Sequence, residues 1–327
     1  MDMTTCDKAL TALLAWKVQP SEALQEVRSG RVFKVKRADG NNLILKRVGE
    51  RAHERLELQL DVLQHLACSG VPVAVPLKAT NGQQVVEVQG TRFTLSPCLI
   101  TDSDPEPGRW EDRIPSYGQT FARLHVALAS YPNVELATTT WSNDPLKECF
   151  EVCAPRLKRS LEVEQAARLS EVLDSVETEM RGALIGLPVQ LIHRDLHDGN
   201  VLSSGDRVVG IVDCDHFSHG TPMMDIAYFL HHTIKWLKEP DGTMIRNEGG
   251  KQWWFSWMPN LIRAYAQARQ VSERERLSLP YLMVWVMIMF ANQYDKGGDR
   301  SETQLYLNLL EFVYRNRQEI GQVVLRA

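Results

Sequence analysis

Hydrophobic and polar positions follow two different periods along the chain, and the change between them marks the first elements of the fold. Residues 27–50 alternate in strand fashion around a polar turn at Ala38–Asn41, which predicts a β-hairpin. From Glu50 to Ser69 the period becomes helical, and one face of the expected helix carries Leu56, Leu60, Leu63 and Ala67. Gly70 then ends this helix, because glycine adopts the left-handed backbone of a helix C-terminus without strain.

The residues that follow predict more strands and then a mainly helical region. Two strands are expected at Gln84–Val88 and Arg92–Leu95. Residues 100–115 are polar and rich in proline and acid, which is typical of a linker. Beyond them the period is helical at Tyr117–Ala129 and at residues 156–182, where the apolar positions are Leu169, Val172, Leu173, Val176 and Met180.

These elements predict an α+β chain with two lobes. The N-terminal lobe, residues 1–99, is expected to hold a small antiparallel sheet with one helix. The C-terminal lobe, residues 116–327, is expected to be larger and mainly helical. The length agrees, because 327 residues exceed the roughly 250–300 at which one hydrophobic core stops growing.

Composition narrows the class of partner. Hydrophobic residues make up 44% of the chain and charged residues 24%, which is typical of a soluble globular protein and argues against disorder. The formal net charge is −4 and no segment is strongly basic, so we predict no nucleic-acid partner.

Cysteine usage and the apolar stretches predict a cytoplasmic protein. The six cysteines form no CxxC pair, and a chain of this length needs no disulfides, so reduced thiols are expected. Met1–Leu14 lacks the basic start and long apolar run of a signal peptide. The most apolar stretch, Tyr281–Ala291, is about half the length that spans a bilayer, so it predicts a buried helix and no membrane partner.

The segment from Leu191 to Leu202 (LIHRDLHDGNVL) carries the residues on which the functional prediction depends. Asp195 is followed five residues later by Asn200, and Asp213 comes at the end of the next expected strand. Phosphoryl transfer needs a group that orients the acceptor hydroxyl and oxygen ligands for Mg²⁺, which prefers carboxylate and amide oxygens. The three residues supply such groups, and His193–Asn200 fits the kinase catalytic-loop pattern H-R-D-L-x-x-x-N.

Three blocks in order resemble the signature of the aminoglycoside phosphotransferase and choline kinase family, whose members have a protein-kinase-like fold. They are the HxDxxxxN run at 193–200, the segment 211–215 (IVDCD) and the segment 220–227 (GTPMMDIA). The resemblance implies that Asp195 is the catalytic base and that Asn200 and Asp213 ligate Mg²⁺. It also implies that Asp225 is mainly structural.

In the first lobe the resemblance is weaker and implies an ATP site. Lys46, at the end of an apolar strand, is similar to the lysine that contacts the α- and β-phosphates, and Glu57 is favoured over Glu54 as its partner. The resemblance also implies a turn that covers the phosphates, with Ser29 and Gly30, and a strand whose backbone holds adenine, with Ser96 and Cys98. The turn lacks the pattern G-x-G-x-x-G.

Several residues allow a structural and a functional interpretation. His193 and His125 are expected to brace the loop, and Asp215 either reaches the metal or only braces its surroundings. The pair His231–His232 is expected to pack or to end a helix rather than to ligate. Core packing is favoured over stacking on an acceptor for the tryptophans Trp236, Trp253, Trp254, Trp257 and Trp285.

The predicted function is therefore transfer of the γ-phosphoryl group of ATP to a hydroxyl of a small molecule. A protein Ser/Thr kinase is a lesser alternative, because Gly220 follows Asp213 by only seven residues and leaves no room for a peptide-docking segment. A non-catalytic nucleotide-binding or scaffold protein is another alternative. It is disfavoured because such a protein usually lacks one of the phosphate or metal groups, and this chain has all of them: Lys46, Asp195, Asn200 and Asp213. Amino sugars, homoserine-like amino alcohols, methylthioribose and choline-type alcohols remain open as acceptors, and the oligomeric state stays open.

Overall fold

The computed structural model describes residues 4–28, 30–49, 55–99, 110–133, 144–235 and 248–327. The chain divides into two compact units. Unit 1 contains residues 1–103, 202–204 and 209–215, and unit 2 contains residues 104–201, 205–208 and 216–327. As predicted, the first unit is built on an antiparallel sheet and the second is mainly helical.

Unit 1 contains a five-stranded antiparallel sheet with the strand order β1-β2-β3-β5-β4. Its strands are β1 (Gln25–Arg28), β2 (Val32–Lys36), β3 (Asn42–Arg47), β4 (Val85–Val88) and β5 (Thr91–Pro97). The predicted hairpin is β2–β3, in which Phe33 lies opposite Leu45 and Val35 opposite Leu43. Because side chains alternate between the two faces of a strand, these four share one face, and all are buried.

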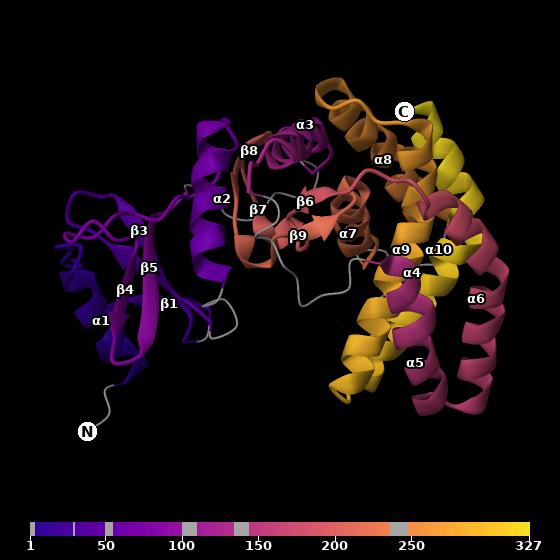
Figure 1. Ribbon diagram of the computed structural model, residues 1–327, viewed down its shortest axis with the longest axis horizontal. Helices are drawn as coiled ribbons and strands as arrows, with labels where there is room; N and C mark the ends of the chain where they lie inside the picture. The colour runs from indigo at the N-terminus through magenta and orange to yellow at the C-terminus, as the bar shows by residue number, and fades with distance from the viewer. Residues whose placement is uncertain (1–3, 29, 50–54, 100–109, 134–143, 236–247) are drawn as a thin grey trace. The chain divides into compact units, whose positions relative to one another are not determined.

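Helix α1 (Thr5–Leu14) packs on that apolar face (Figure 1). A capping box begins it: the Thr4 hydroxyl accepts the Asp7 N–H, and the Asp7 carboxylate accepts the Thr4 N–H. Its buried residues are Ala9, Ala12 and Leu13. The prediction of one helix in the first lobe was therefore wrong, because only three small or apolar positions of this short helix meet the sheet.

Helix α2 (Leu56–Cys68) is the helix that the sequence predicted, but its buried face is shifted. Leu60 and Ala67 are only half-buried, and the fully buried residues are Leu56, Val62, Leu63 and Leu66. The stripe at positions 56, 63 and 66 also passes through position 59, because residues three and four apart share a helix face. Position 59 is Gln59, a polar side chain on an apolar stripe.

Unit 2 consists mainly of helices, among which α9 and α10 lie side by side, α3 packs on α8 and α7 packs on α9 (Figure 1). The helices are α3 (Trp110–Ala129), α4 (Pro145–Lys147), α5 (Ala154–Ser160), α6 (Val163–Leu184), α7 (Pro222–Ile234), α8 (Glu248–Ala268), α9 (Glu273–Lys296) and α10 (Arg300–Arg326). A π-helical turn at Glu148–Cys153 joins α4 to α5.

Helix α3 begins inside the segment that the sequence analysis assigned to the linker. Of that segment, residues 110–115 are described, and they are helical. Trp110 is buried because its ring packs against three other aromatic rings, with centroid distances of 5.2 Å to Tyr117, 6.0 Å to Phe229 and 5.8 Å to Trp257. The remainder of the predicted linker, residues 100–109, lies outside the described residues.

The core of unit 2 confirms several expectations. The buried residues of α6 are the five apolar positions predicted for it. Trp254, Trp257 and Trp285 are fully buried, as core packing requires, whereas Trp253 is only partly buried and its indole N–H donates to Glu111. Trp236 lies outside the described residues. Helix α9 is long and apolar enough to cross a membrane by length and composition alone, but 67% of its most apolar window is buried within the protein, as in a core helix.

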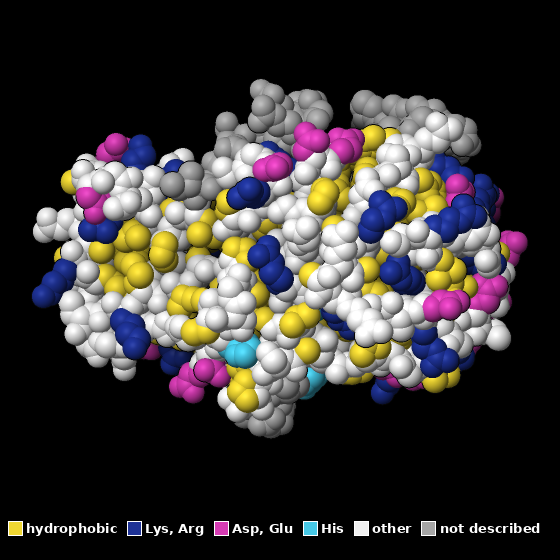
Figure 2. Space-filling model, turned by 90° about the horizontal axis from the view of Figure 1, so that it is seen from above, with side chains coloured by type: hydrophobic (Ala, Val, Ile, Leu, Met, Phe, Trp, Pro, Cys, Tyr) yellow, Lys and Arg dark blue, Asp and Glu magenta, His cyan; other side chains and the backbone are white. Residues whose placement is uncertain are grey.

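The surface shows no continuous basic area on the face drawn in Figure 2. Lys and Arg side chains are interspersed there with acidic, apolar and uncharged ones. All six cysteines are described and none forms a disulfide.

Two short antiparallel pairs of strands complete the fold and frame the loop of interest. Strand β6 (Gln190–Ile192) pairs with β9 (Ser218–Gly220), and β7 (Val201–Ser204) pairs with β8 (Arg207–Ile211). Residues 193–200 connect β6 to β7, and we call them the catalytic loop.

Candidate active site

One fully buried carboxylate holds the start of the catalytic loop. Asp225, in the first turn of α7, accepts the backbone N–H groups of His193 and Arg194, each at 2.8 Å. On α3, Nε2 of His125 lies 3.0 Å from the same carboxylate and Nδ1 lies 2.7 Å from the Tyr265 hydroxyl. Asp225 and His125 therefore have the structural roles expected of them.

The buried setting would be unfavourable for an isolated charge. Burial by itself raises the pKa of Asp225, but the hydrogen bond and charge of His125, the charge of His193 and the backbone N–H together hold the pKa below its usual value. Asp225 is therefore an ionised acceptor around which the backbone of the loop is ordered. This matters at Arg194, whose φ of 71° is uncommon for a residue with a side chain.

The side chain of Arg194 is fixed beneath the loop. Its guanidinium lies 5.2 Å from the centroid of the Trp285 ring and 3.7 Å from the Glu148 carboxylate, and Trp285 donates to the same carboxylate at 3.0 Å. Arg194 is 7% exposed, so its charge is taken up within the protein and does not reach the surface of the loop.

Asp195 is oriented by two other side chains of unit 2. Asn200 donates from Nδ2 to the carbonyl oxygen of Asp195 at 2.8 Å and to its Oδ2 at 3.0 Å. Because the amide nitrogen is used in this way, the amide oxygen of Asn200 points away from Asp195. The hydroxyl of Tyr228, on α7, is also hydrogen-bonded to Asp195.

Tyr228 was not predicted from the sequence. Burial and the adjacent charge of Asp195 raise its pKa well above the usual value, so the hydroxyl keeps its proton and donates. The only available signal was its position three residues after Asp225, on the same side of the expected helix. His193, by contrast, behaves as expected: its ring is buried and its Nδ1 accepts the Asp195 N–H at 3.3 Å.

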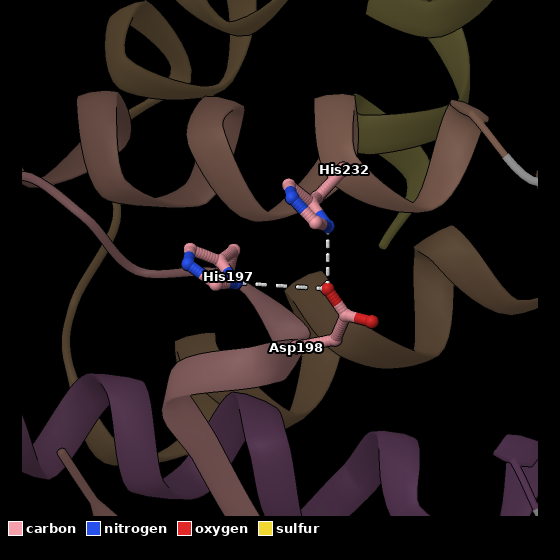
Figure 3. Close-up of side chains that lie close together, drawn as sticks. All are labelled: His197, Asp198 and His232. Carbon is pink, nitrogen blue, oxygen red and sulfur yellow. Dashed lines mark ion pairs between the residues drawn. The ribbon is translucent and has the colours of Figure 1, made fainter. Parts of the chain in front are cut away.

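Beside Asp195 lies a cluster of His197, Asp198 and His232, shown in Figure 3. Nδ1 of His232 lies 2.6 Å from Oδ1 of Asp198, and Nδ1 of His197 lies 3.8 Å from the same oxygen. The two imidazole rings are stacked, with centroids 4.5 Å apart and planes 17° apart. Burial would raise the pKa of Asp198, but the two neighbouring rings outweigh it and hold the pKa well below its usual range.

In unit 1, Lys46 lies on β3 between two carboxylates. Its Nζ is 2.8 Å from Oδ1 of Asp213 and 2.8 Å from Oδ2 of Asp215. Burial would lower the pKa of Lys46, but the charges and hydrogen bonds of Asp215 and Asp213 raise it above its usual value. The amine therefore stays charged. Lys46 and Asp213, predicted separately, are brought together.

Glu57, the predicted partner of Lys46, does not have that role in the structure. Its side chain is exposed on α2, and the described ion pairs of Lys46 are with the two aspartates. Gln59, one half-turn further along α2, donates instead to Oδ1 of Asp215 at 2.6 Å. The contact follows from the shifted face of α2, since position 59 lies on the buried stripe and position 57 does not. Glu54 lies outside the described residues.

The other predicted nucleotide residues are only partly described. Ser29 lies outside the described residues, and Gly30 has a φ of 61° in the turn between β1 and β2, where its N–H donates to Glu26. Ser96 lies opposite Ile44 in the sheet, and the N–H of Cys98 donates to the Asn42 carbonyl at 3.0 Å. The Cys98 donor is thus used within unit 1.

The residues predicted to bind metal have the right chemistry for a hard divalent cation. Asp213 and Asp215 offer carboxylate oxygens in unit 1, and Asn200 offers an amide oxygen directed away from Asp195 in unit 2. Mg²⁺ binds oxygen ligands of this kind, whereas the buried Cys214 between the two aspartates keeps its proton because burial raises its pKa. Taken one by one, these residues offer the kind of oxygen donor that the metal of a phosphoryl-transfer enzyme uses.

Comparison with known proteins places these observations in a family. The model of the phosphotransferase enzyme family (APH) matches residues 22–277. The chain is similar to homoserine kinases of Methylobacillus flagellatus, with 29% identity over 63% of this chain and 60% of that protein, and of Methylobacterium nodulans, with 28% identity over 75% and 69%. Its fold is similar to a microcompartment-associated aminopropanol kinase, with a TM-score of 0.68, 17% identity, and coverage of 96% and 98%.

The chain has a protein-kinase-like fold, similar to that of the aminopropanol kinase, and its catalytic loop carries Asp195 hydrogen-bonded to Asn200. The chain belongs to the phosphotransferase enzyme family. The name of this family is that of phosphotransferases, and the activity, acceptor and cofactors of this chain are matters of proposal. The match covers 60% and 69% of the two homoserine kinases, so their particular substrate is a matter of proposal for this chain.

Proposed function

We propose that this enzyme transfers the γ-phosphoryl group of ATP to the hydroxyl of a small amino alcohol, homoserine or a molecule of similar size. The observation that carries the proposal is the setting of Asp195, whose carboxylate is oriented by Asn200 and Tyr228 on a loop fixed by buried Asp225. The name of the curated relatives, homoserine kinase, supports an amino alcohol over a sugar.

In the proposed reaction Asp195 accepts a hydrogen bond from the acceptor hydroxyl and orients its oxygen in line with the γ-phosphorus. A new bond forms between this oxygen and phosphorus as the bond to the bridging oxygen breaks, and ADP leaves with that electron pair. The hydroxyl proton passes late to the Asp195 carboxylate. The Asn200 and Tyr228 hydrogen bonds keep that carboxylate in one orientation, which saves the entropy of aligning it at each turnover.

We assign the oxygen ligands of Mg²⁺ to Asp213 and Asn200, and the contact with the α- and β-phosphates to Lys46. Mg²⁺, when bound, offsets the negative charge of the phosphates. The pairing of Lys46 with two carboxylates keeps its charge and position ready for an anion, because a buried amine without such partners would tend to lose its proton. Ser29, Gly30, Ser96 and Cys98 remain predictions for the nucleotide, and a cytoplasmic location remains a prediction for the protein.

The substitution Asp195→Asn tests the catalytic assignment. Asparagine keeps the size of the side chain and removes the proton acceptor, so turnover should fall by about 10²–10⁴-fold while the affinity for ATP and the melting temperature stay close to wild type. Initial rates with homoserine and titration calorimetry with a non-hydrolysable ATP analogue give the two measurements. Turnover of the variant within a few-fold of wild type would remove Asp195 from the mechanism.

A panel of acceptors tests the substrate class. ATP consumption should be stimulated by homoserine and short amino alcohols and much less by amino sugars or methylthioribose. No stimulation by any acceptor, together with intact nucleotide binding, would favour the non-catalytic alternative.

A further inference from the structure

The cluster of His197, Asp198 and His232 has no role in the reaction described so far. It lies next to the catalytic base, since Nε2 of His197 is 3.9 Å from Oδ2 of Asp195. The three side chains are 23%, 26% and 34% exposed, so solvent and small molecules reach them.

The charge of the cluster follows from its hydrogen bonds. Nδ1 of His197 accepts the Gly199 N–H at 3.0 Å, which places the ring proton on Nε2, facing Asp195. The His197 ring thus stands between two carboxylates, Asp195 on one side and Asp198 on the other. Arg194, the cation nearest in sequence, is buried against Glu148 and does not compensate them. The surface beside the base is therefore suited to a cation.

The two oxygens of Asp198 are in different environments. Oδ1 is buried and faces the two imidazole rings, while the other oxygen points away from both in Figure 3. Because Oδ1 is buried and a quarter of the side chain is exposed, the exposure falls on the rest of the side chain. His232 thereby fixes one oxygen, and the other points away from both rings.

The ring geometry distinguishes the kind of cation. A metal ion bound to imidazole lies in the ring plane on the nitrogen lone pair, and two stacked rings whose planes are 17° apart cannot both direct a lone pair at one ion. An ammonium group needs no such convergence, since it donates one strong hydrogen bond to a single carboxylate oxygen. The cluster fits an ammonium group and does not fit a transition metal.

We propose that Asp198, held by His232, is the residue that binds the ammonium group of the acceptor while Asp195 receives its hydroxyl. One imidazole ring separates the two carboxylates, which selects amino alcohols whose nitrogen and oxygen are a few carbon atoms apart. The proposal rests on the proposed function and adds to it a residue that determines specificity.

Three acceptors distinguish recognition of the ammonium group from recognition of the carboxylate. Homoserine carries an ammonium and a carboxylate, 3-aminopropan-1-ol keeps only the ammonium, and 4-hydroxybutyrate keeps only the carboxylate. In Asp198→Asn, KM for the two ammonium acceptors should rise about 10- to 100-fold, as for the loss of one charge-assisted hydrogen bond, while kcat changes little. KM for 4-hydroxybutyrate should stay unchanged. Asp206→Asn, at a 72% exposed carboxylate of unit 2, should match wild type with all three.

A merely structural role for Asp198 gives a different pattern, because a disordered loop lowers kcat for all three acceptors alike. That outcome overturns the proposal. His232→Asn keeps the charge of Asp198 and a donor near the position of Nδ1, so it should retain the preference for ammonium acceptors. Loss of that preference in His232→Asn, with Asp198 intact, also overturns it.

Equilibrium binding separates this proposal from the proposed function. Calorimetry with 3-aminopropan-1-ol, in the presence of a non-hydrolysable ATP analogue and Mg²⁺, should show binding that Asp198→Asn weakens. Such binding without turnover leaves the ammonium site standing and refutes the proposed reaction. Turnover whose KM is independent of Asp198 leaves the reaction standing and refutes the site. Neither binding nor turnover refutes both.

Discussion

Replacement of Asp225 by alanine should lower the free energy of unfolding more than any other single change near the catalytic loop. The carboxylate is fully buried, accepts two backbone N–H groups at 2.8 Å and lies 3.0 Å from Nε2 of His125. Hydrogen bonds to charged groups contribute about 1.5–3 kcal/mol each, and breaking a buried pair costs about 3–5 kcal/mol. The contributions overlap, so we expect about 3–5 kcal/mol, a large fraction of the roughly 5–15 kcal/mol of a folded domain.

Urea unfolding of wild type and variant measures this difference, and Asp174→Asn, at an exposed position of α6, is the control that should change stability by less than about 0.5 kcal/mol. A double-mutant cycle with His125→Ala separates the pair from the backbone contacts, because the double variant should lose less than the sum of the two single ones. A loss below about 1 kcal/mol in Asp225→Ala would refute the reasoning, since it would mean that two buried N–H groups need no acceptor.

The contribution of Asp225 to the free energy of unfolding has a predictable pH dependence. The pKa of Asp225 is lower in the folded protein than its ordinary value, so its contribution to stability is fully present above the unfolded pKa of about 3.9. The contribution is lost as the pH falls through the folded pKa. The stability difference between wild type and Asp225→Asn should therefore be constant from pH 8 to about pH 5 and shrink below about pH 4. A difference that grows on acidification would contradict this.

Two further substitutions test contacts that the sequence did not reveal. Tyr228→Phe removes the hydroxyl that is hydrogen-bonded to Asp195 and should lower kcat by about tenfold, with KM for ATP unchanged. The control Tyr314→Phe, on α10, should have no effect. A kcat of Tyr228→Phe equal to that of Tyr314→Phe would contradict the role of Tyr228 in orienting Asp195. Gln59→Leu removes the donor to Asp215 and should destabilise unit 1 by about 1–2 kcal/mol in urea unfolding, against no change for Gln64→Leu on the same helix.

The sequence predicted the catalytic loop well because the loop acts through local spacing. Asp195 and Asn200 are five residues apart and meet within one loop, and Asp225 follows in a block whose helix start is marked by a proline. The fold class followed from the change of hydrophobic period. The short helix α1 escaped prediction because it buries only two alanines and one leucine.

The partner of Lys46 shows what spacing cannot decide. Glu57 has the expected charge at an acceptable distance along the chain, but the rotation of α2 is set by which apolar side chains enter the core. A shift of that face places Gln59, rather than Glu57, toward Asp215. A glutamine on an otherwise apolar stripe was the signal in the sequence, because a buried polar group needs a partner.

Helix α7 gives the clearest reason why the site could be predicted only in part. Asp225, Tyr228 and His232 lie on one side of it, because steps of three and seven residues return to nearly the same face of a helix. In that order they contact the backbone at 193–194, the side chain of Asp195 and the side chain of Asp198. Asp225 accepts main-chain N–H groups, so its role does not depend on which side chains the loop carries. Tyr228 and His232 bind side chains, so their roles become visible only once Asp195 and Asp198 have been placed.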